Sequence, residues 1–342
     1  MQTESSDTNG VLADLQTDLI GWGRRFWKDL VLWWRWQPDK AFFFALLLVW
    51  LALFQFWGNS TLGYVNTTSL PAWMLNAYRS SSNSDVGDDR HGMFVPFVVL
   101  GLFWWKRRQL MSLKPDLWMP AALMIALALV LHIFGYVVQQ PRISIAAMFL
   151  GVYGITGLVW GREWLRASFF PFFIFAFCIP FGSLAEPITF RLRLIVSESV
   201  EFLAHSVLGM DVVRQGTNLT DSSRTFGFDV AAPCAGMRSL TATVGLALVY
   251  AFVSFESWWK RGLLLASAFP LAVVGNLVRM MTIVIAASLG GQSAGNFVHD
   301  GGPAGIISLL PYCIPFGGLL YLGHLMRNRE AAPVLVGARQ PT

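Results

Sequence analysis

Apolar residues along this chain fall into long runs that short polar or charged segments separate. A helix needs about 20 mainly apolar residues to cross the hydrocarbon core of a bilayer. Most of the runs approach that length, and the short run at 93–105 must borrow flanking residues. The pattern predicts an all-α, polytopic transmembrane helical bundle of about eight spans, at residues 41–57, 93–105, 117–138, 143–161, 168–184, 236–255, 262–286 and 303–325.

Three segments between the spans have other patterns. Residues 58–92 are rich in Asn, Ser, Thr and Asp and predict an irregular loop. Residues 187–210 are too charged to span a membrane, and their apolar positions recur at helical spacings, which predicts an amphipathic helix on the outer surface. Residues 211–230 alternate weakly around central turn residues and predict a short outer hairpin. The face predicted for the amphipathic helix comprises Ile188, Leu192, Ile195, Phe202 and Ser206.

The amino-terminal region differs from the spans because tryptophans alternate with basic residues in the stretch 21–36. This composition is typical of a helix that lies in the lipid headgroup region. The first 20 residues lack the basic start and apolar core of a cleavable signal peptide. We therefore predict a cytoplasmic tail with an interfacial helix at 1–40, a transmembrane domain at 41–325 and a cytoplasmic tail at 326–342.

Composition supports a membrane protein and changes the meaning of the charge. The chain is 55% hydrophobic and only 13% charged, whereas soluble proteins carry about 25% charged residues. Its net charge of +5 therefore indicates topology rather than nucleic-acid binding. With a cytoplasmic amino terminus, every short inner connection is basic, as the positive-inside rule requires. This arrangement puts both termini inside and the segment before residue 236 outside.

The cysteines do not form a disulfide or metal pattern. There are three of them, with no CxxC motif, so we expect no disulfide framework, no zinc site and no cofactor. Cys178 and Cys313 lie in apolar runs and are expected to be packing residues. Cys234 lies in DVAAPCAGMRSLT, where a polar segment meets an apolar run, and Arg238 follows one helical turn later. A helix amino terminus and a nearby cation lower the pKa of a thiol; the alternative is a small apolar residue at a helix start.

The seventh predicted span contains Asn276 and Arg279, three residues apart on one helical face. An arginine inside a membrane costs about 2.5–3.5 kcal/mol or more, so it normally faces a cavity or a partner. Counted from Gly262, Arg279 lies about 26 Å along the helix, toward the outer side. It is either a functional cation or a structural one that pairs with backbone carbonyls, Glu186 or Glu201.

The stretch 290–303, GGQSAGNFVHDGGP, is predicted to be a flexible outer loop that carries His299 and Asp300. A single loop histidine is usually just solvated. Here, however, a thiol, a guanidinium and an imidazole are all expected at the outer face. A thiolate nucleophile needs a base or cation beside it, and acyl transfer needs a donor for the developing oxyanion. The set indicates cysteine-dependent acyl transfer at a membrane surface.

Three motifs, PCAGMRSL, GNLVRMMTI and NFVHDGGPAG, resemble those of the exosortase/archaeosortase family, over roughly residues 90–325. The resemblance implies a cysteine transpeptidase or endopeptidase with Cys234 as nucleophile, Arg279 as essential cation and His299 as acid/base. It also implies membrane-anchored protein substrates with a C-terminal sorting signal: a short Pro-containing motif, a transmembrane helix and a basic tail. Cleavage would deliver the protein to the bacterial surface, often in connection with exopolysaccharide. Ala235 departs from the serine that often follows the cysteine in this family.

We therefore expect a multi-pass enzyme of the bacterial inner membrane, with both termini cytoplasmic and the active site on the periplasmic face. Its expected partners are the lipid bilayer and the membrane-anchored substrates, not nucleic acid. Two rival hypotheses are a transporter and a non-catalytic membrane subunit of an exopolysaccharide export system. The sequence leaves the acceptor nucleophile and the oligomeric state open.

Overall fold

The computed structural model describes residues 39–61, 66–80, 89–181, 186–229, 237–302 and 310–331, together with most of the stretch 21–35. The chain forms two compact units. Unit 1 comprises Met1–Trp73 and Pro96–Ala176, and unit 2 comprises Met74–Val95 and Phe177–Thr342. Each unit is described by itself below.

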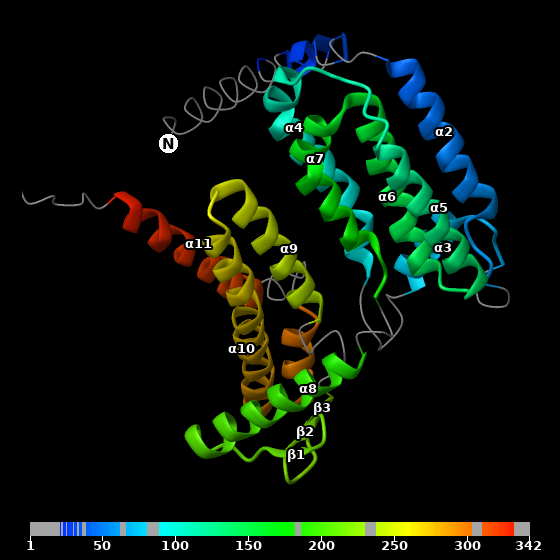
Figure 1. Ribbon diagram of the computed structural model, residues 1–342. Coiled ribbons are helices and arrows are strands. Elements are labelled where there is room, and N and C mark those ends of the chain that lie inside the picture. Colours follow the sequence, from blue (N-terminus) through cyan, green and yellow to red (C-terminus); the bar gives the residue numbers. More distant parts are fainter. Residues whose placement is uncertain are drawn as a thin grey trace, which may run out of the picture. The chain divides into compact units, whose positions relative to one another are not determined.

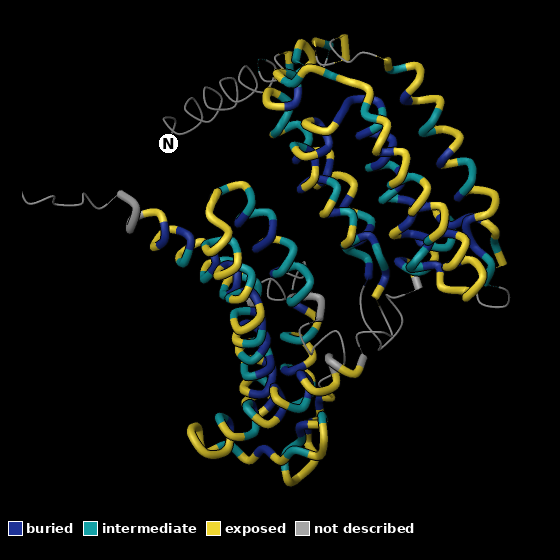
Figure 2. The backbone as a smooth tube through the Cα atoms, viewed as in Figure 1, coloured by how far each residue is buried: buried dark blue, intermediate teal, exposed yellow. Residues whose placement is uncertain are grey.

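Unit 1 is built from apolar helices around α6. Small residues let neighbours approach α6 closely: Gly151 lies against the Trp50 ring and Gly154 lies against Ile125. The Trp50 indole also donates a hydrogen bond to the Met148 carbonyl (2.9 Å). As a result α6 is largely buried while α2 is largely exposed along its sides (Figure 2). The helices of this unit are α2 (Lys40–Trp57), most of α4 (Val95–Ser112), α5 (Ala121–Val137), α6 (Pro141–Trp160) and α7 (Arg162–Ile174) (Figure 1).

The described residues of the stretch 21–35 are helical, as predicted. Asp29 forms an ion pair with Arg107 of α4 (2.8 Å), and the rings of Phe26 and Trp104 of α4 have centres 4.4 Å apart. Trp27 and Trp34 remain exposed. This helix is therefore attached to α4 by charge and ring contacts, and its place in the headgroup region stays a prediction.

The prediction of an irregular loop at 58–92 was wrong, because α3 (Leu70–Ser80) lies within it. Leu70, Met74 and Tyr78 recur every four residues, and all three are buried. The Ser69 hydroxyl accepts a hydrogen bond from the Ala72 amide (3.2 Å), which caps the helix start. Polar residues before and after this short apolar stripe made the whole segment resemble a loop in the sequence. A 3₁₀ turn, η2 (Arg90–Met93), follows before α4.

Unit 2 contains a three-helix bundle, formed by α9 (Met237–Ser254), α10 (Trp258–His299) and α11 (Leu310–Ala331) (Figure 1). Glycines again permit close approach, since Gly318 meets Leu271 and Gly323 meets Tyr250. A hydrophobic core joins the three helices and contains Ala247, Ala251, Phe255, Leu264, Ala268, Leu319 and Met326.

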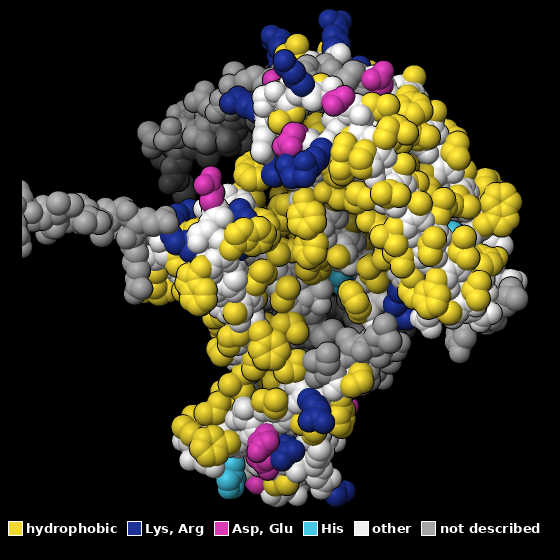
Figure 3. All heavy atoms as spheres, in the orientation of Figure 1, with side chains coloured by type: hydrophobic (Ala, Val, Ile, Leu, Met, Phe, Trp, Pro, Cys, Tyr) yellow, Lys and Arg dark blue, Asp and Glu magenta, His cyan; other side chains and the backbone are white. Residues whose placement is uncertain are grey.

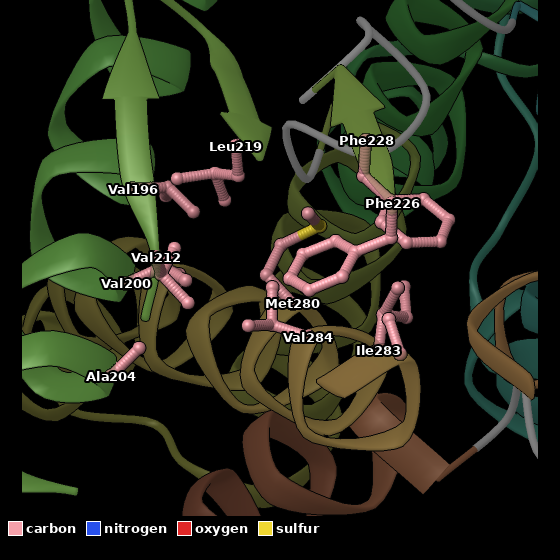
Figure 4. Packing of buried hydrophobic residues seen from close by; sticks show 11 residues of the cluster. Val196, Val200, Ala204, Val212, Leu219, Phe226, Phe228, Met280, Ile283 and Val284 are labelled. Carbon is pink, nitrogen blue, oxygen red and sulfur yellow. The ribbon is translucent and has the colours of Figure 1, made fainter. Parts of the chain in front are cut away.

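The predicted hairpin is confirmed, and a third strand extends it, while its place on the outer side stays a prediction. β1 (Val213–Gln215), β2 (Asn218–Thr220) and β3 (Gly227–Asp229) form an antiparallel sheet in the order β1-β2-β3. Gly216 has φ +65° in the β1–β2 turn, a conformation that favours glycine. The strands lie over α8 (Glu186–Glu201), the π-helical turn η5 (Phe202–Val207) and α10, and they share one hydrophobic cluster with them (Figure 4).

The amphipathic helix at 187–210 is confirmed as a helix, but its predicted buried face was wrong. The side chains of Ile195 and Phe202 are 53% and 61% exposed. The buried stripe instead runs at steps of four residues through Leu192, Val196, Val200 and Ala204. Small valine and alanine side chains pack against the sheet and α10, whereas the prediction assigned the largest apolar side chains to the buried face. The π-helical turn then shifts the phase from Phe202 onward.

Apolar side chains also cover the outside of the helices. In each unit, hydrophobic side chains extend over the helix sides, and charged ones gather mostly toward the ends (Figure 3). Within the described residues, α2, α6 and α10 are long and apolar enough to cross a membrane, and Ala121–Val137 and Leu240–Ser254 are shorter apolar helices. Each of the eight predicted runs overlaps a helix. An all-α membrane fold is confirmed, while the count of eight spans stays a prediction.

Candidate active site

Cys234 lies outside the described residues, which end at Asp229 of β3 and resume at Met237 of α9. Both flanking elements belong to unit 2 and pack against α10. Arg238 is the second residue of α9. The site can therefore be built from β3, α9 and α10, the elements on either side of the cysteine in the sequence.

α10 does not end in the flexible loop predicted at 290–303. It continues to His299, with non-helical backbone at Gly290 and Gly291, whose φ is +72°. A Cβ placed on Gly295 would lie 2.9 Å from the Ala287 Cβ, whereas residues eight apart in a straight helix are about 12 Å apart. The chain therefore turns at the glycine pair, and residues 292–299, here called the return helix, fold back onto α10. Two glycines break a helix but do not prevent it from resuming.

Folding back places His299 beside the sheet and α10. Its ring stacks on Phe228 of β3, with ring centres 6.5 Å apart and planes 27° apart. Its Nδ1 lies 3.1 Å from the Asp300 carboxylate. The imidazole stays 40% exposed, so it combines a fixed orientation with access. His299 is thus the last residue of a helix rather than part of a loop, and its predicted neighbour Asp300 contacts it directly.

Arg279 is half-buried in α10, and within the described residues its guanidinium has no hydrogen-bond or ion-pair partner. The structural alternative of a pair with Glu201 was wrong, because Glu201 binds Arg214 instead (3.0 Å). The side chain of Glu186 lies outside the described residues. An arginine in an apolar helix is costly without a partner, so the position favours a role with a ligand.

Asn276, one turn before Arg279, also has a donor group without a hydrogen-bond partner among the described residues. It is only 3% exposed, and its Nδ2 has no hydrogen-bond partner in the described part of the chain. A buried polar group without a partner costs roughly 1–3 kcal/mol. Two adjacent donors on one helical face therefore lack acceptors, which is the arrangement expected of a site that binds a negative or carbonyl oxygen.

The start of α9 lies at the level of these donors. Asn276 is about 27 Å along α10 from Trp258, and Met237 is about 26 Å along α9 from Ser254, at 1.5 Å per residue. The two helices are antiparallel neighbours joined by a short turn. The first turn and the positive dipole end of α9 therefore lie level with Asn276.

The return helix lies over the same face of α10. Asn276, Arg279, Ile283 and Ala287 follow one another at spacings of three and four and share that face. His299, four residues past Gly295, reaches about the level of Ile283, roughly 6 Å along the axis from Arg279. The return helix, which carries His299, thus meets α10 at Ala287, on the face that also carries Asn276 and Arg279.

A side chain that the sequence did not single out connects the strand to the return helix. Gln292 accepts a hydrogen bond from the Gly227 amide (2.8 Å) and donates one to the Gly227 carbonyl (3.4 Å). Gly295 lets the helix approach, since a Cβ there would lie 2.5 Å from the Phe228 ring. Only the glycine pair before Gln292 marks this region in the sequence, and it indicates a break rather than a contact.

The other cysteines and the metal-ligand types add no second site. Cys178 is buried, as predicted, but Cys313 is exposed on α11, so the prediction of a packing role for it was wrong. An apolar residue on the outside of a membrane helix meets lipid, and burial in protein is not needed. No cluster of three or more His, Cys, Asp or Glu residues in the described ranges could hold a metal ion.

Comparison with known proteins agrees with the motifs. A search of curated proteins and a search of solved structures gave no significant match. The family model for transmembrane exosortase (Exosortase_EpsH) matches residues 84–315, more than half of the chain, including the predicted site residues. This chain belongs to the transmembrane exosortase family.

Proposed function

We propose that this exosortase is a cysteine endopeptidase or transpeptidase that removes a C-terminal sorting signal from exported membrane proteins. One observation carries the proposal: Asn276 and Arg279, two donors with no acceptor among the described residues, lie level with the start of the helix that follows Cys234. A site rich in donors suits a reaction that develops negative charge on sulfur and then on oxygen.

Chain connectivity supports Cys234 as the nucleophile. It lies three residues before Met237 and five after Asp229. A chain spans at most about 3.6 Å per residue, so its Cα lies within about 11 Å of that of Met237 and within about 18 Å of that of Asp229. The dipole of α9 favours the thiolate at this position, and Arg238 adds a cation to the first helical turn.

The proposed reaction assigns one role to each group. The Cys234 thiolate attacks the scissile carbonyl carbon, and Arg279 donates hydrogen bonds to the oxyanion of the tetrahedral intermediate. His299 protonates the leaving amine as the C–N bond breaks, which leaves a thioester on Cys234. Water or an acceptor amine then attacks the thioester, and His299 accepts its proton as the thiolate leaves.

Topology completes the proposal. From the basic inner connections we infer that both termini lie in the cytoplasm and that the site lies at the periplasmic side of the bacterial inner membrane. The substrate would present a Pro-containing motif at that side, followed by its transmembrane helix and basic tail. This assignment rests on the charge pattern and on family membership.

The test is cleavage of a co-expressed exported protein with such a signal, measured by its change in mass. Cys234→Ala should accumulate uncleaved substrate, while the matched control Cys313→Ala should process it normally, with equal abundance of both variants in the membrane. Normal cleavage by Cys234→Ala would reject the enzyme and favour the rival hypotheses of a transporter or a non-catalytic export subunit.

A further inference from the structure

Gln292 makes an unusual contact, because its side-chain amide binds both backbone groups of a single strand residue. Its Oε1 accepts from the Gly227 N–H at 2.8 Å and its Nε2 donates to the Gly227 carbonyl at 3.4 Å. The same Nε2 lies 2.9 Å from Asn296 Oδ1 on the next helical turn. An amide can satisfy a backbone in this way only when both backbone groups face it.

The strand geometry explains why they do. Among the described residues β3 pairs with β2, with Leu219 opposite Phe228 and Thr220 opposite Gly227. The N–H and C=O of one strand residue point to the same side, and adjacent residues alternate. Because both Gly227 groups bind Gln292, they point away from β2, toward the other edge of β3. Gln292 takes the place that a further strand would occupy there.

The face of the return helix that carries Gln292 also carries His299, seven residues later. Along this face, Gln292 contacts Gly227, Gly295 meets the Phe228 ring, and His299 stacks on Phe228. β3 therefore lies along the return helix at three successive points. In the sequence, Cys234 follows the last residue of β3 by five positions, and the helix ends at the histidine.

From this geometry we infer that Gln292 is a positioning residue, which fixes the strand that leads to Cys234 against the helix that carries His299. It acts through the backbone of Gly227 and needs no contact with substrate. Two hydrogen bonds to one residue fix the register of the strand as well as its distance, since a shift by one residue would turn both backbone groups away. The inference rests on the proposed roles of Cys234 and His299.

The test measures alkylation of Cys234 by iodoacetamide against pH, using the full chain in membranes with Cys178→Ala and Cys313→Ala. A thiol paired with an imidazole reacts at lower pH than an isolated thiol, whose pKa is about 8.5. Gln292→Ala should move the profile toward that of His299→Ala and slow substrate cleavage by about 10- to 100-fold, because small misplacements have large effects on rate. The abundance of the protein in the membrane should not change.

Ser293→Ala is the matched control, since Ser293 is exposed beside Gln292 on the same helix and should keep the original profile. Gln292→Glu keeps the acceptor for the Gly227 N–H but loses the donor, so it should give an intermediate profile. A Gln292→Ala profile identical to that of the unmodified site would overturn the inference, as would lower abundance with an unchanged profile. If His299→Ala itself leaves the profile unchanged, the proposed pairing of Cys234 and His299 fails instead.

Discussion

The beginning and the middle of α10 differ in how their cationic side chains are partnered. At its beginning, Lys260 donates to the Met326 carbonyl at 3.3 Å. Arg261 donates to the Phe255 carbonyl at 2.8 Å and lies over the rings of Phe252 and Trp258, at 4.4 and 5.0 Å from their centres. These cations are used to close the α9–α10 turn and to attach α11.

Farther along the helix, Arg279 and Asn276 have no such partners in the part of the chain that the structure describes. Their surroundings are more apolar than the helix start, so the cost of leaving them unsatisfied is larger. A fold that needed only packing at these positions would be more stable with apolar side chains. The difference is consistent with a beginning of α10 that serves the fold and with the proposal that Asn276 and Arg279, near its middle, bind a ligand at some cost in stability.

Arg279→Ala should produce the largest loss of cleavage, and it should distinguish the middle of α10 from its beginning. Loss of an oxyanion donor lowers turnover by about 10²- to 10³-fold, and membrane abundance should hold because the guanidinium has no hydrogen-bond or ion-pair partner among the described residues. Arg279→Lys should recover only part of the rate, since an ammonium lacks the forked geometry. The matched control Arg261→Ala removes contacts of the fold and should leave cleavage largely intact. Loss of abundance in Arg279→Ala with full activity in Arg279→Lys would assign Arg279 to structure.

Asn276→Leu should separate stability from activity. The substitution removes a buried amide without a partner and replaces it by a side chain of similar volume, so the unfolding temperature in detergent should rise or stay unchanged. Cleavage should fall by about 10-fold or more. A lower unfolding temperature with normal cleavage would show that the amide is satisfied and structural.

Gly295→Ala tests the return helix. Its new Cβ would lie 2.5 Å from the Phe228 ring and 2.9 Å from the Ala287 Cβ, and overpacking typically costs about 1–3 kcal/mol. We expect a lower unfolding temperature and slower cleavage. Gly262→Ala on the same α10 has open space around it and should be neutral or stabilising by about 0.5–1 kcal/mol. Equal behaviour of the two variants would contradict the close contact with β3.

Local features of the fold and of the candidate site could be predicted from the sequence, whereas features that depend on distant contacts could not. The apolar runs predicted the helices because hydrophobicity and length are local properties, and the polar-to-apolar change at Cys234 placed a helix start within three residues of Met237. The polar character and the spacing of Asn276 and Arg279 could also be recognised in the sequence. Their lack of partners among the described residues could not be predicted, because it depends on which distant groups approach them.

The fold-back at Gly290 and Gly291 could not be predicted from the sequence for a related reason. A glycine pair indicates that a helix stops, whereas its resumption depends on Gly295 meeting Phe228, a residue far away in the chain. The buried face of α8 was missed because small side chains such as Ala204 pack where large ones cannot. Long-range packing decided both features.

The smallest effect is expected at the surface loop between β2 and β3. Desolvation raises the pKa of Asp221, but the hydrogen bonds from the Thr225 hydroxyl and from the Thr225 and Phe226 amides together outweigh it and lower the pKa below its usual value. A lowered pKa in the folded state stabilises above the unfolded value, near 3.9, and that stabilisation is lost as pH falls through the folded value. Asp221→Asn should therefore lower the unfolding temperature slightly at pH 7 and not at pH 2–3. Glu198→Gln, at an exposed site on α8, is the control and should show no such dependence on pH.

The most direct test of the central claim is the mass of the enzyme during turnover. The account predicts that the exosortase, isolated after brief exposure to a substrate with a C-terminal sorting signal, carries a substrate fragment on Cys234 through a thioester. Hydroxylamine should release this fragment, His299→Ala should change its amount, and Cys234→Ala should carry none. Cleavage of the substrate with no adduct on the enzyme, and at an equal rate by Cys234→Ala, would contradict the account.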